Sequence, residues 1–167
     1  MKIGLLSDTH GTVDPSIFEH FKDCDEIWHA GDIGNQEVSD LLSKFKPFKA
    51  VYGNIDGGIV KTTYPEKLIF ECEGFKILII HIGGYPPKYN PTVKKLLLSE
   101  SPDIVICGHS HILRVMRDPE REILYLNPGA AGKEGFHKIK TLLKFELKDK
   151  KIMNMQVVEL GKRGAIS

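Results

Sequence analysis

Apolar runs of strand length alternate with segments of helical period in the first third of the chain. The runs span residues 2–7, 26–30 and 49–52, and each is followed by polar residues and a glycine. Between them, apolar residues recur at helical spacing in two segments, which begin at Asp14 and Asn35. This repeat of strand, loop and helix is typical of a parallel α/β sheet.

The pattern then changes to pairs of strands joined by turns. It predicts three antiparallel hairpins, over residues 67–81, 113–126 and 141–160. Between the first two hairpins it predicts an irregular loop at 85–91, a helix at 92–100 and a buried strand at 103–107. The chain is expected to be frayed from Gly161 onward. No repeat or linker divides the sequence, so we expect one domain over residues 1–167.

The composition is that of an ordinary globular protein, with 41% hydrophobic and 27% charged residues. Lysine and arginine number 23 against 22 aspartates and glutamates, and this net charge of +1 argues against a strongly electrostatic nucleic-acid binder. The three cysteines, Cys24, Cys72 and Cys107, have no CxxC spacing and suit a reducing compartment. The sequence contains no signal-peptide pattern and no apolar run of membrane-spanning length, so we expect a cytoplasmic protein.

Polar side chains with metal-binding chemistry follow five of the predicted strands. They are Asp8, His10, Asp32, Asn54, His81, His109 and His111. Ligands of open α/β sheets bind beyond the carboxyl ends of the strands, so we expect these side chains to converge. Four imidazoles, two carboxylates and an amide exceed the needs of one tetrahedral ion and suit two ions that share a carboxylate. Paired metal ions of this kind are used for phosphoryl transfer.

Taken one at a time, these residues have simpler explanations, such as a loop carboxylate or a turn asparagine. Their joint occurrence at strand ends favours the metal site. We assign no ligand role to the other histidines: His29 is expected to pack beside the site, His20 to lie on a helix and His137 in a loop. Trp28 is expected in the core. Gly83 and Gly84 form either a simple turn or a phosphate-facing loop that binds substrate.

The motifs resemble those of the calcineurin-like metallophosphoesterase superfamily, in the same order along most of the chain. They are Asp8-x-His10, Gly31-Asp32, Gly53-Asn54, His81 with its trailing glycines, and Gly108-His109-Ser110-His111. The turn Asn127-Pro128-Gly129 is similar to one in the small bacterial and archaeal phosphodiesterases, which lack a lid. The resemblance implies an α/β fold, a four-layer αββα sandwich of two mixed β-sheets flanked by helices.

The resemblance also implies roles for the seven residues. Asp8, His10 and His111 would hold a first divalent metal ion, and Asn54, His81 and His109 a second, with Asp32 bridging them. Mn²⁺ is the expected metal, with Ni²⁺, Fe²⁺/Fe³⁺ and Zn²⁺ as alternatives. A hydroxide between the metals would attack phosphorus in line. Asp32, Asn54 and His81 would thus act in catalysis by holding this hydroxide and positioning the phosphate.

One position departs from the superfamily pattern. Many members have a histidine directly after Gly-Asn that acts near the leaving group, whereas this chain has Ile55. An isoleucine cannot donate a proton, so we expect a bias toward activated or diester substrates. Asp56 is expected to orient one of the ligand histidines.

Three functions remain open at this point. We expect a phosphodiesterase that acts on small phosphoesters. A non-catalytic protein-interaction scaffold is the second hypothesis, because the same superfamily includes a trafficking subunit whose metal site is degraded. A nuclease is the third, and the near-neutral charge counts against it. A homo-oligomer formed through the terminal hairpins is compatible with each of the three.

Overall fold

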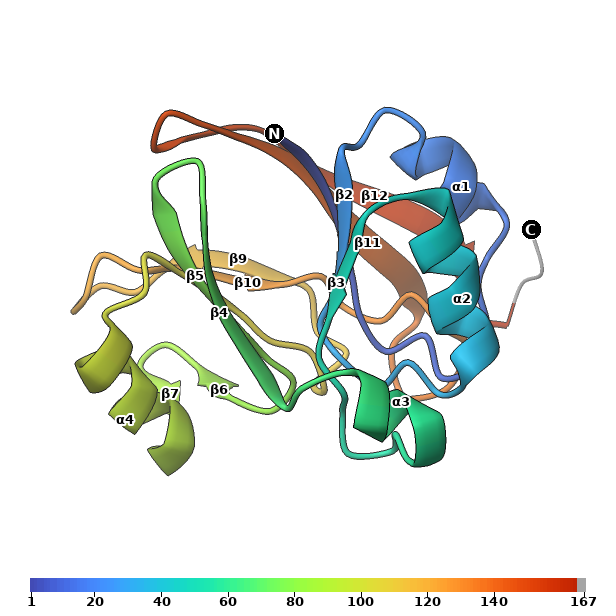
Figure 1. The fold of residues 1–167 in the computed structure, drawn as a ribbon, viewed down its shortest axis with the longest axis horizontal. Coiled ribbons are helices and arrows are strands. Elements are labelled where there is room, and N and C mark those ends of the chain that lie inside the picture. Colours follow the sequence, from blue (N-terminus) through green and yellow to red (C-terminus); the bar gives the residue numbers. More distant parts are fainter. Residues whose placement is uncertain (165–167) are drawn as a thin grey trace.

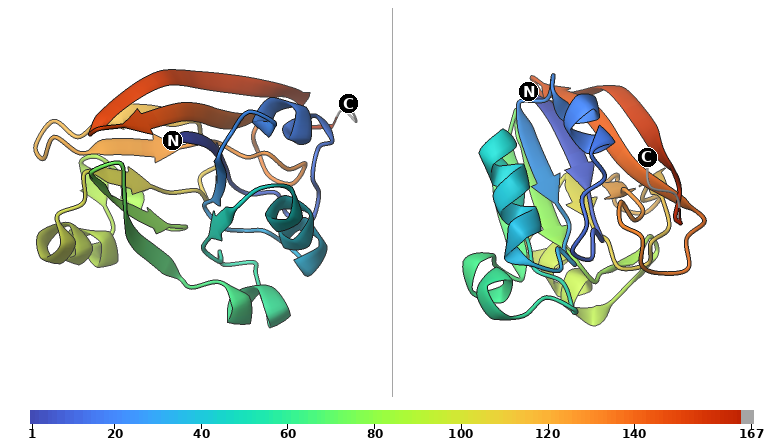
Figure 2. Two further views of the ribbon diagram at one scale, coloured as in Figure 1. Left: turned by 45° about the horizontal axis from the view of Figure 1, so that its top comes forward. Right: turned by 90° about the vertical axis from the view of Figure 1, so that its right-hand side faces the viewer.

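Two five-stranded sheets pack face to face, and helices cover both outer faces (Figures 1 and 2). The computed structural model describes residues 1–164. Both sheets mix parallel and antiparallel pairs. The αββα sandwich is therefore confirmed. The prediction of fraying from Gly161 is wrong at its start, because the last strand runs to Lys162. For residues 165–167 the prediction lies outside the described part of the chain.

The first sheet has the strand order β12-β11-β1-β2-β3. Its strands are β1 (Lys2–Leu6), β2 (Glu26–His29), β3 (Phe48–Ala50), β11 (Ile139–Lys148) and β12 (Lys151–Lys162). The strands β1, β2 and β3 are parallel to one another, as the strand–helix repeat predicts. The predicted terminal hairpin is formed by β11 and β12, and β11 pairs with β1. The two ends of the chain thus lie in one sheet.

The second sheet has the strand order β4-β5-β8-β10-β9. Its strands are β4 (Lys67–Cys72), β5 (Phe75–Ile80), β8 (Ile104–Ile106), β9 (Arg114–Arg117) and β10 (Leu124–Asn127). The two predicted hairpins, β4–β5 and β9–β10, are antiparallel. The buried strand β8 lies between β5 and β10, parallel to both.

Three apolar layers hold the sandwich together, because the central strands are covered on both faces. In β5, Ile77 and Ile79 contribute to the layer between the sheets, and Leu78 and Ile80 pack toward α4 (Pro91–Glu100). The third layer lies between the first sheet and the helices α1 (Ser16–Phe21) and α2 (Gln36–Phe45). Trp28 is fully buried in the layer between the sheets, as predicted.

Two short features differ from the sequence prediction. The proline-rich loop was expected to be irregular, but β6 (Gly84–Tyr85) and β7 (Lys88–Tyr89) form a small antiparallel pair there. A six-residue helix, α3 (Gly58–Thr63), follows the Gly53-Asn54 motif and has only one buried residue, so it carries no apolar stripe to detect. Within residues 1–164, none of the helices is long and apolar enough to cross a membrane.

Candidate metal centre

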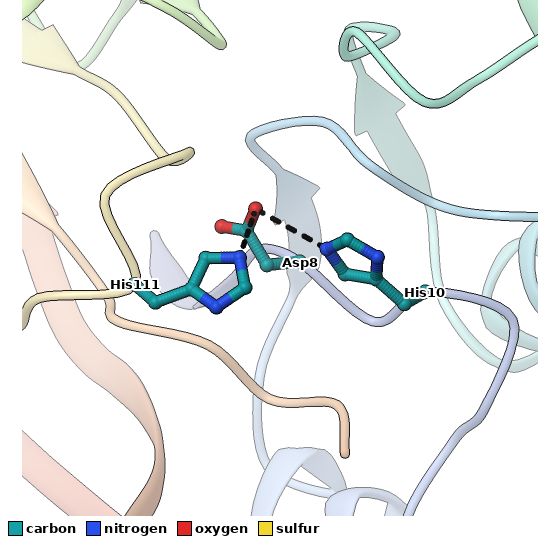
Figure 3. A group of neighbouring side chains, drawn as sticks. All are labelled: Asp8, His10 and His111. Carbon is teal, nitrogen blue, oxygen red and sulfur yellow. Dashed lines mark ion pairs between the residues drawn. The ribbon is translucent and has the colours of Figure 1, made fainter. Parts of the chain in front are cut away.

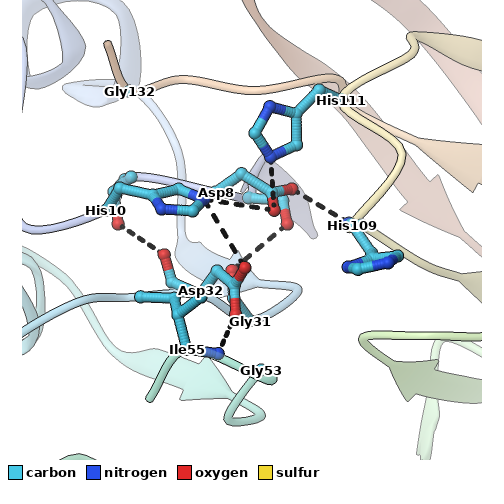
Figure 4. A network of polar contacts seen from close by, with 12 residues as sticks. Asp8, His10, Gly31, Asp32, Gly53, Ile55, His109, His111 and Gly132 are labelled. Atoms are coloured by element: carbon cyan, nitrogen blue, oxygen red, sulfur yellow. Dashed lines mark hydrogen bonds and ion pairs between the residues drawn. The ribbon is translucent and has the colours of Figure 1, made fainter. Parts of the chain in front are cut away.

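The seven predicted side chains converge where loops after β1, β2, β3, β5 and β8 meet. Figure 3 shows Asp8, His10 and His111, and Figure 4 adds Asp32 and His109. Their nitrogen and oxygen atoms form two groups, Asp8 with His10 and His111, and Asp32 with His81 and His109. Within each group, the candidate ligand atoms lie within 4.8 Å of one another. Asn54 joins the second group, since its Oδ1 atom is 3.1 Å from Nε2 of His81.

Asp32 lies between the two groups. Its Oδ2 atom is 3.3 Å from Nε2 of His81 and 3.5 Å from Nε2 of His10. The backbone N–H of Ile55 donates to its other oxygen, at 3.1 Å (Figure 4). One carboxylate therefore faces histidines of both groups, which is the position that a bridging ligand requires.

In the second group, two acceptor atoms face each other with no donor between them when the His81 ring is neutral. His81 contacts the carbonyl oxygen of Ala30 at 2.7 Å through Nδ1, so Nδ1 carries the proton and a neutral ring leaves a lone pair on Nε2, facing Asn54 Oδ1. Oδ1 of Asp8 and Nε2 of His10 are buried and have no hydrogen-bond partner. Buried polar atoms without a partner are costly, and a bound cation would satisfy them. The donor set thus fits metal ions.

The pKa shifts of the aspartate and histidine side chains agree with a site that attracts positive charge. Burial alone would raise the pKa of Asp8, but the neighbouring imidazoles of His10, His111 and His81 outweigh it and lower that pKa well below its usual range. The Asp8 carboxylate in turn raises the pKa of His10. Burial opposes protonation of His81, yet Asp32 and Asp8 raise its pKa as well.

Five of the site residues hold a left-handed backbone conformation that non-glycine residues rarely adopt. They are Asp8, His10, Asp32, His109 and His111, with φ between 47° and 66°. Aspartate and histidine tolerate this region better than most residues, and such strain is concentrated at functional sites. In the loops after β1 and β8, this conformation lets two side chains that are two residues apart reach the same site.

Asp56 supports the site in a way that differs from the prediction. Its carboxylate accepts hydrogen bonds from the backbone N–H groups of Gly53, Ile33 and Gly34, at 2.7 to 3.0 Å. Within residues 1–164 these hydrogen bonds go to the backbone and not to a ligand histidine, and they tie the loop after β3 to the loop that carries Asp32. A carboxylate is suited to this role because it can accept several backbone donors at once.

The glycines of the motifs make room for ligands from neighbouring loops. A Cβ atom on Gly108 would lie 2.1 Å from Oγ of Ser7 and 2.9 Å from Oδ2 of Asp8. A Cβ atom on Gly53 would lie 2.0 Å from Oδ1 of Asp32. The glycine of one motif thus sits directly behind the ligand of another, which explains why the motifs occur together.

We expect Gly53→Ala to displace the Asp32 carboxylate and to lower the free energy of unfolding by about 1–3 kcal/mol, as overpacking does. Thermal unfolding and metal titration should both register the change. Gly57→Ala is the matched control, because its Cβ would meet no atom within 4 Å and its φ of −142° suits alanine. Equal effects of the two substitutions would contradict the close approach.

His29 packs beside the site, as predicted, and is fully buried. Its Nε2 atom is 2.9 Å from Oγ1 of Thr9, and its Nδ1 atom accepts from the N–H of Gly31 at 3.1 Å. Burial lowers the pKa of His29 to about 4. The folded protein therefore holds this ring neutral across the range in which an exposed histidine becomes charged.

This burial predicts an acid-sensitive contribution to stability. Between pH 6.5 and pH 4 the unfolded chain binds a proton at His29 that the folded protein does not, so the free energy of unfolding falls as the pH falls. The full loss is about 3 kcal/mol. Urea unfolding from pH 7 to pH 4 should show a flatter pH dependence in His29→Gln than in the wild type, whereas parallel curves would contradict the assignment.

The outcomes for the remaining sequence predictions are mixed. Gly83 and Gly84 have packing roles: a Cβ on Gly83 would meet Sγ of Cys107 at 2.6 Å, and one on Gly84 would meet the Lys88 carbonyl oxygen at 2.4 Å. Their contact with phosphate stays a prediction. His137 lies in a loop, as predicted, and it also contacts His111, with the two Nδ1 atoms 3.2 Å apart. No spacing in the sequence links these two histidines.

Known proteins match the chain over most of its length. The profile of the calcineurin-like phosphoesterase superfamily domain matches residues 1–150. A protein of Methanocaldococcus jannaschii named "probable metallophosphoesterase" is 33% identical over 156 residues, which cover 90% of this chain and 78% of that protein.

Two solved structures share the fold. A structure described as a novel archaeal phosphodiesterase has a TM-score of 0.75 and 24% identity, over 95% of this chain and all of that one. Vps29 from Entamoeba histolytica, solved in complex with Zn²⁺, has a TM-score of 0.73 and 18% identity, over 95% of this chain and 99% of that one. At these identities, the likeness concerns the fold.

Proposed function

The chain belongs to the calcineurin-like phosphoesterase superfamily, and from this membership we propose that it is a metal-dependent phosphodiesterase that hydrolyses small phosphoesters. The observation that carries the proposal is the pair of ligand groups, with Asp32 between them and buried polar atoms left without a hydrogen-bond partner. We further propose that Mn²⁺ fills the site, with Ni²⁺, iron and Zn²⁺ as alternatives, and that the protein works in the cytoplasm.

Each group would hold one ion. Asp8, His10 and His111 would bind the first, and His81, His109 and Asn54 the second, while Asp32 would contribute to both. Bound divalent ions supply an activated water at neutral pH and neutralise charge on phosphoryl oxygens. The chain itself holds the ligands in place, through the Ala30 carbonyl behind His81 and through Asp56 behind the two loops.

The open side of the site favours one direction of substrate approach. Asp8 and Asp32 are buried at its floor, whereas Asn54 and His109 are exposed. A cleft of about 240 Å³ opens beside Asn54 and His81 and extends along Ile82 and Thr92. This cleft would accommodate one arm of a phosphodiester. Ile55, beside Asn54, offers the leaving group no proton, which favours esters whose alcohol leaves readily.

The test is hydrolysis of paired nitrophenyl mono- and diesters by metal-stripped protein, with Mn²⁺, Ni²⁺, Zn²⁺ or Mg²⁺ restored in turn. We expect diester turnover that depends on metal, is lost in His109→Ala and is retained in His20→Ala, a histidine on α1 outside the seven. Two bound ions without turnover of any ester would contradict the proposal and favour a scaffold. Salt-sensitive cleavage of polynucleotides instead of small esters would favour a nuclease.

A further inference from the structure

His111 meets two different partners through opposite edges of its ring. Its Nε2 atom lies 3.2 Å from Oδ1 of Asp8, on the metal side. Its Nδ1 atom lies 3.2 Å from Nδ1 of His137, and the two rings meet edge to face with centroids 5.1 Å apart. His137 belongs to the loop between β10 and β11 and is only partly exposed. The structure thus places a second imidazole behind a candidate ligand.

The hydrogen-bond partners determine where the protons lie. Nε2 of His137 is 2.9 Å from the carbonyl oxygen of Gly132, and a carbonyl only accepts, so this nitrogen carries the proton. A neutral ring then has its lone pair on Nδ1 and must accept from His111. His111 therefore donates from its own Nδ1, and its Nε2 lone pair is directed toward Asp8.

The loop is built around this contact. Gly132 is anchored to the site itself, because its N–H donates to the carbonyl oxygen of Asp8 at 3.0 Å. Gly135 lies against the His111 ring, where a Cβ atom would be 2.1 Å from Nδ1, and its φ of +122° favours glycine. The carbonyl that orients His137 and the backbone that carries Asp8 are thus held as one unit.

We propose that His137 is a positioning residue, which fixes the proton of His111 on Nδ1 and so presents the Nε2 lone pair to the first metal ion. The inference rests on the proposed function only in taking His111 as a ligand. Partners of this kind behind ligand histidines set the tautomer and the ring orientation, and their loss weakens metal binding about 10–100-fold.

The first test reads the tautomer directly. In metal-free protein at pH 8, two-bond ¹H–¹⁵N correlations of the histidine rings should show His111 protonated on Nδ1. His137→Leu should release this preference, and His137→Gln should retain it, because an amide offers both a donor for Gly132 and an acceptor for His111. A wild-type His111 protonated on Nε2 would overturn the proposal, whether or not the variants fold.

The second test is calorimetric titration with Mn²⁺. We expect one of the two sites to weaken about 10–100-fold in His137→Leu and to recover in His137→Gln. His20→Leu, a histidine on α1, should bind as the wild type does. Unchanged affinity in His137→Leu would overturn the positioning role. A wild type that binds no metal would contradict the proposed function, while the tautomer measurement would still decide the role of His137.

Discussion

Replacing Asp32 with asparagine should lower kcat/KM for a nitrophenyl diester by about 1000-fold, which corresponds to ~4 kcal/mol of lost transition-state stabilisation. The substitution removes the negative charge that faces His10 and His81 at 3.5 and 3.3 Å. It keeps an oxygen that can accept from the N–H of Ile55, so the loop geometry should survive. The measurement is turnover at saturating Mn²⁺, together with the number of ions bound per chain.

Asp149→Asn is the matched control for this experiment. Asp149 is an exposed carboxylate whose φ of 47° resembles the 56° of Asp32, so both substitutions place asparagine in the left-handed region. The control should leave turnover and metal binding unchanged. If Asp32→Asn retained more than a tenth of wild-type activity with both ions bound, the shared-carboxylate role of Asp32 would be wrong.

Trp28→Ala should lower the free energy of unfolding by about 3–5 kcal/mol, more than is expected for Gly53→Ala. Trp28 is fully buried between the two sheets, and its ring packs edge-on against Phe70 and Phe145. Its Nε1–H donates to the Glu26 carboxylate at 2.6 Å. Because most domains have a free energy of unfolding of only about 5–15 kcal/mol, the variant should be close to unfolding.

Urea unfolding measures this loss, and Trp28→Phe separates its causes. Phenylalanine loses the hydrogen bond to Glu26 but keeps most of the buried ring, so its loss should be clearly smaller. Equal losses would indicate that the hydrogen bond, not the packing between the sheets, dominates. Since β2 leads directly into the Gly31-Asp32 loop, the alanine variant should also bind metal more weakly.

Much of the fold followed from local patterns. The apolar runs predicted the strands of both sheets, and helical spacing predicted α2 and α4, because each side chain's burial leaves its period in the sequence. The sandwich of two sheets came from the resemblance and not from periodicity. The short helix α3 and the pair β6–β7 escaped prediction, since neither has enough residues to show a period.

The candidate site was likewise predictable only in part. Its seven side chains stand out because their chemistry is unusual at strand ends, and the structure brings all seven together. Their role as metal ligands remains a prediction. The contacts of Asp56 and His137 escape prediction, because a residue that works through hydrogen bonds has no motif of its own. Only its neighbours in space distinguish it from an ordinary loop residue.

The sequence by itself determined the family, the strand-forming segments and the types of donor atom available to a metal. The sequence also predicted the strand pairs within hairpins, but the tertiary structure alone decided which strands distant in sequence pair, as when β1 lies beside β11 from the far end of the chain. It also decided that a glycine of one loop lies behind a ligand of the next. The physical reason is that periodicity reports how deeply a side chain is buried, whereas partners distant in sequence are selected by packing and hydrogen bonding across the whole fold.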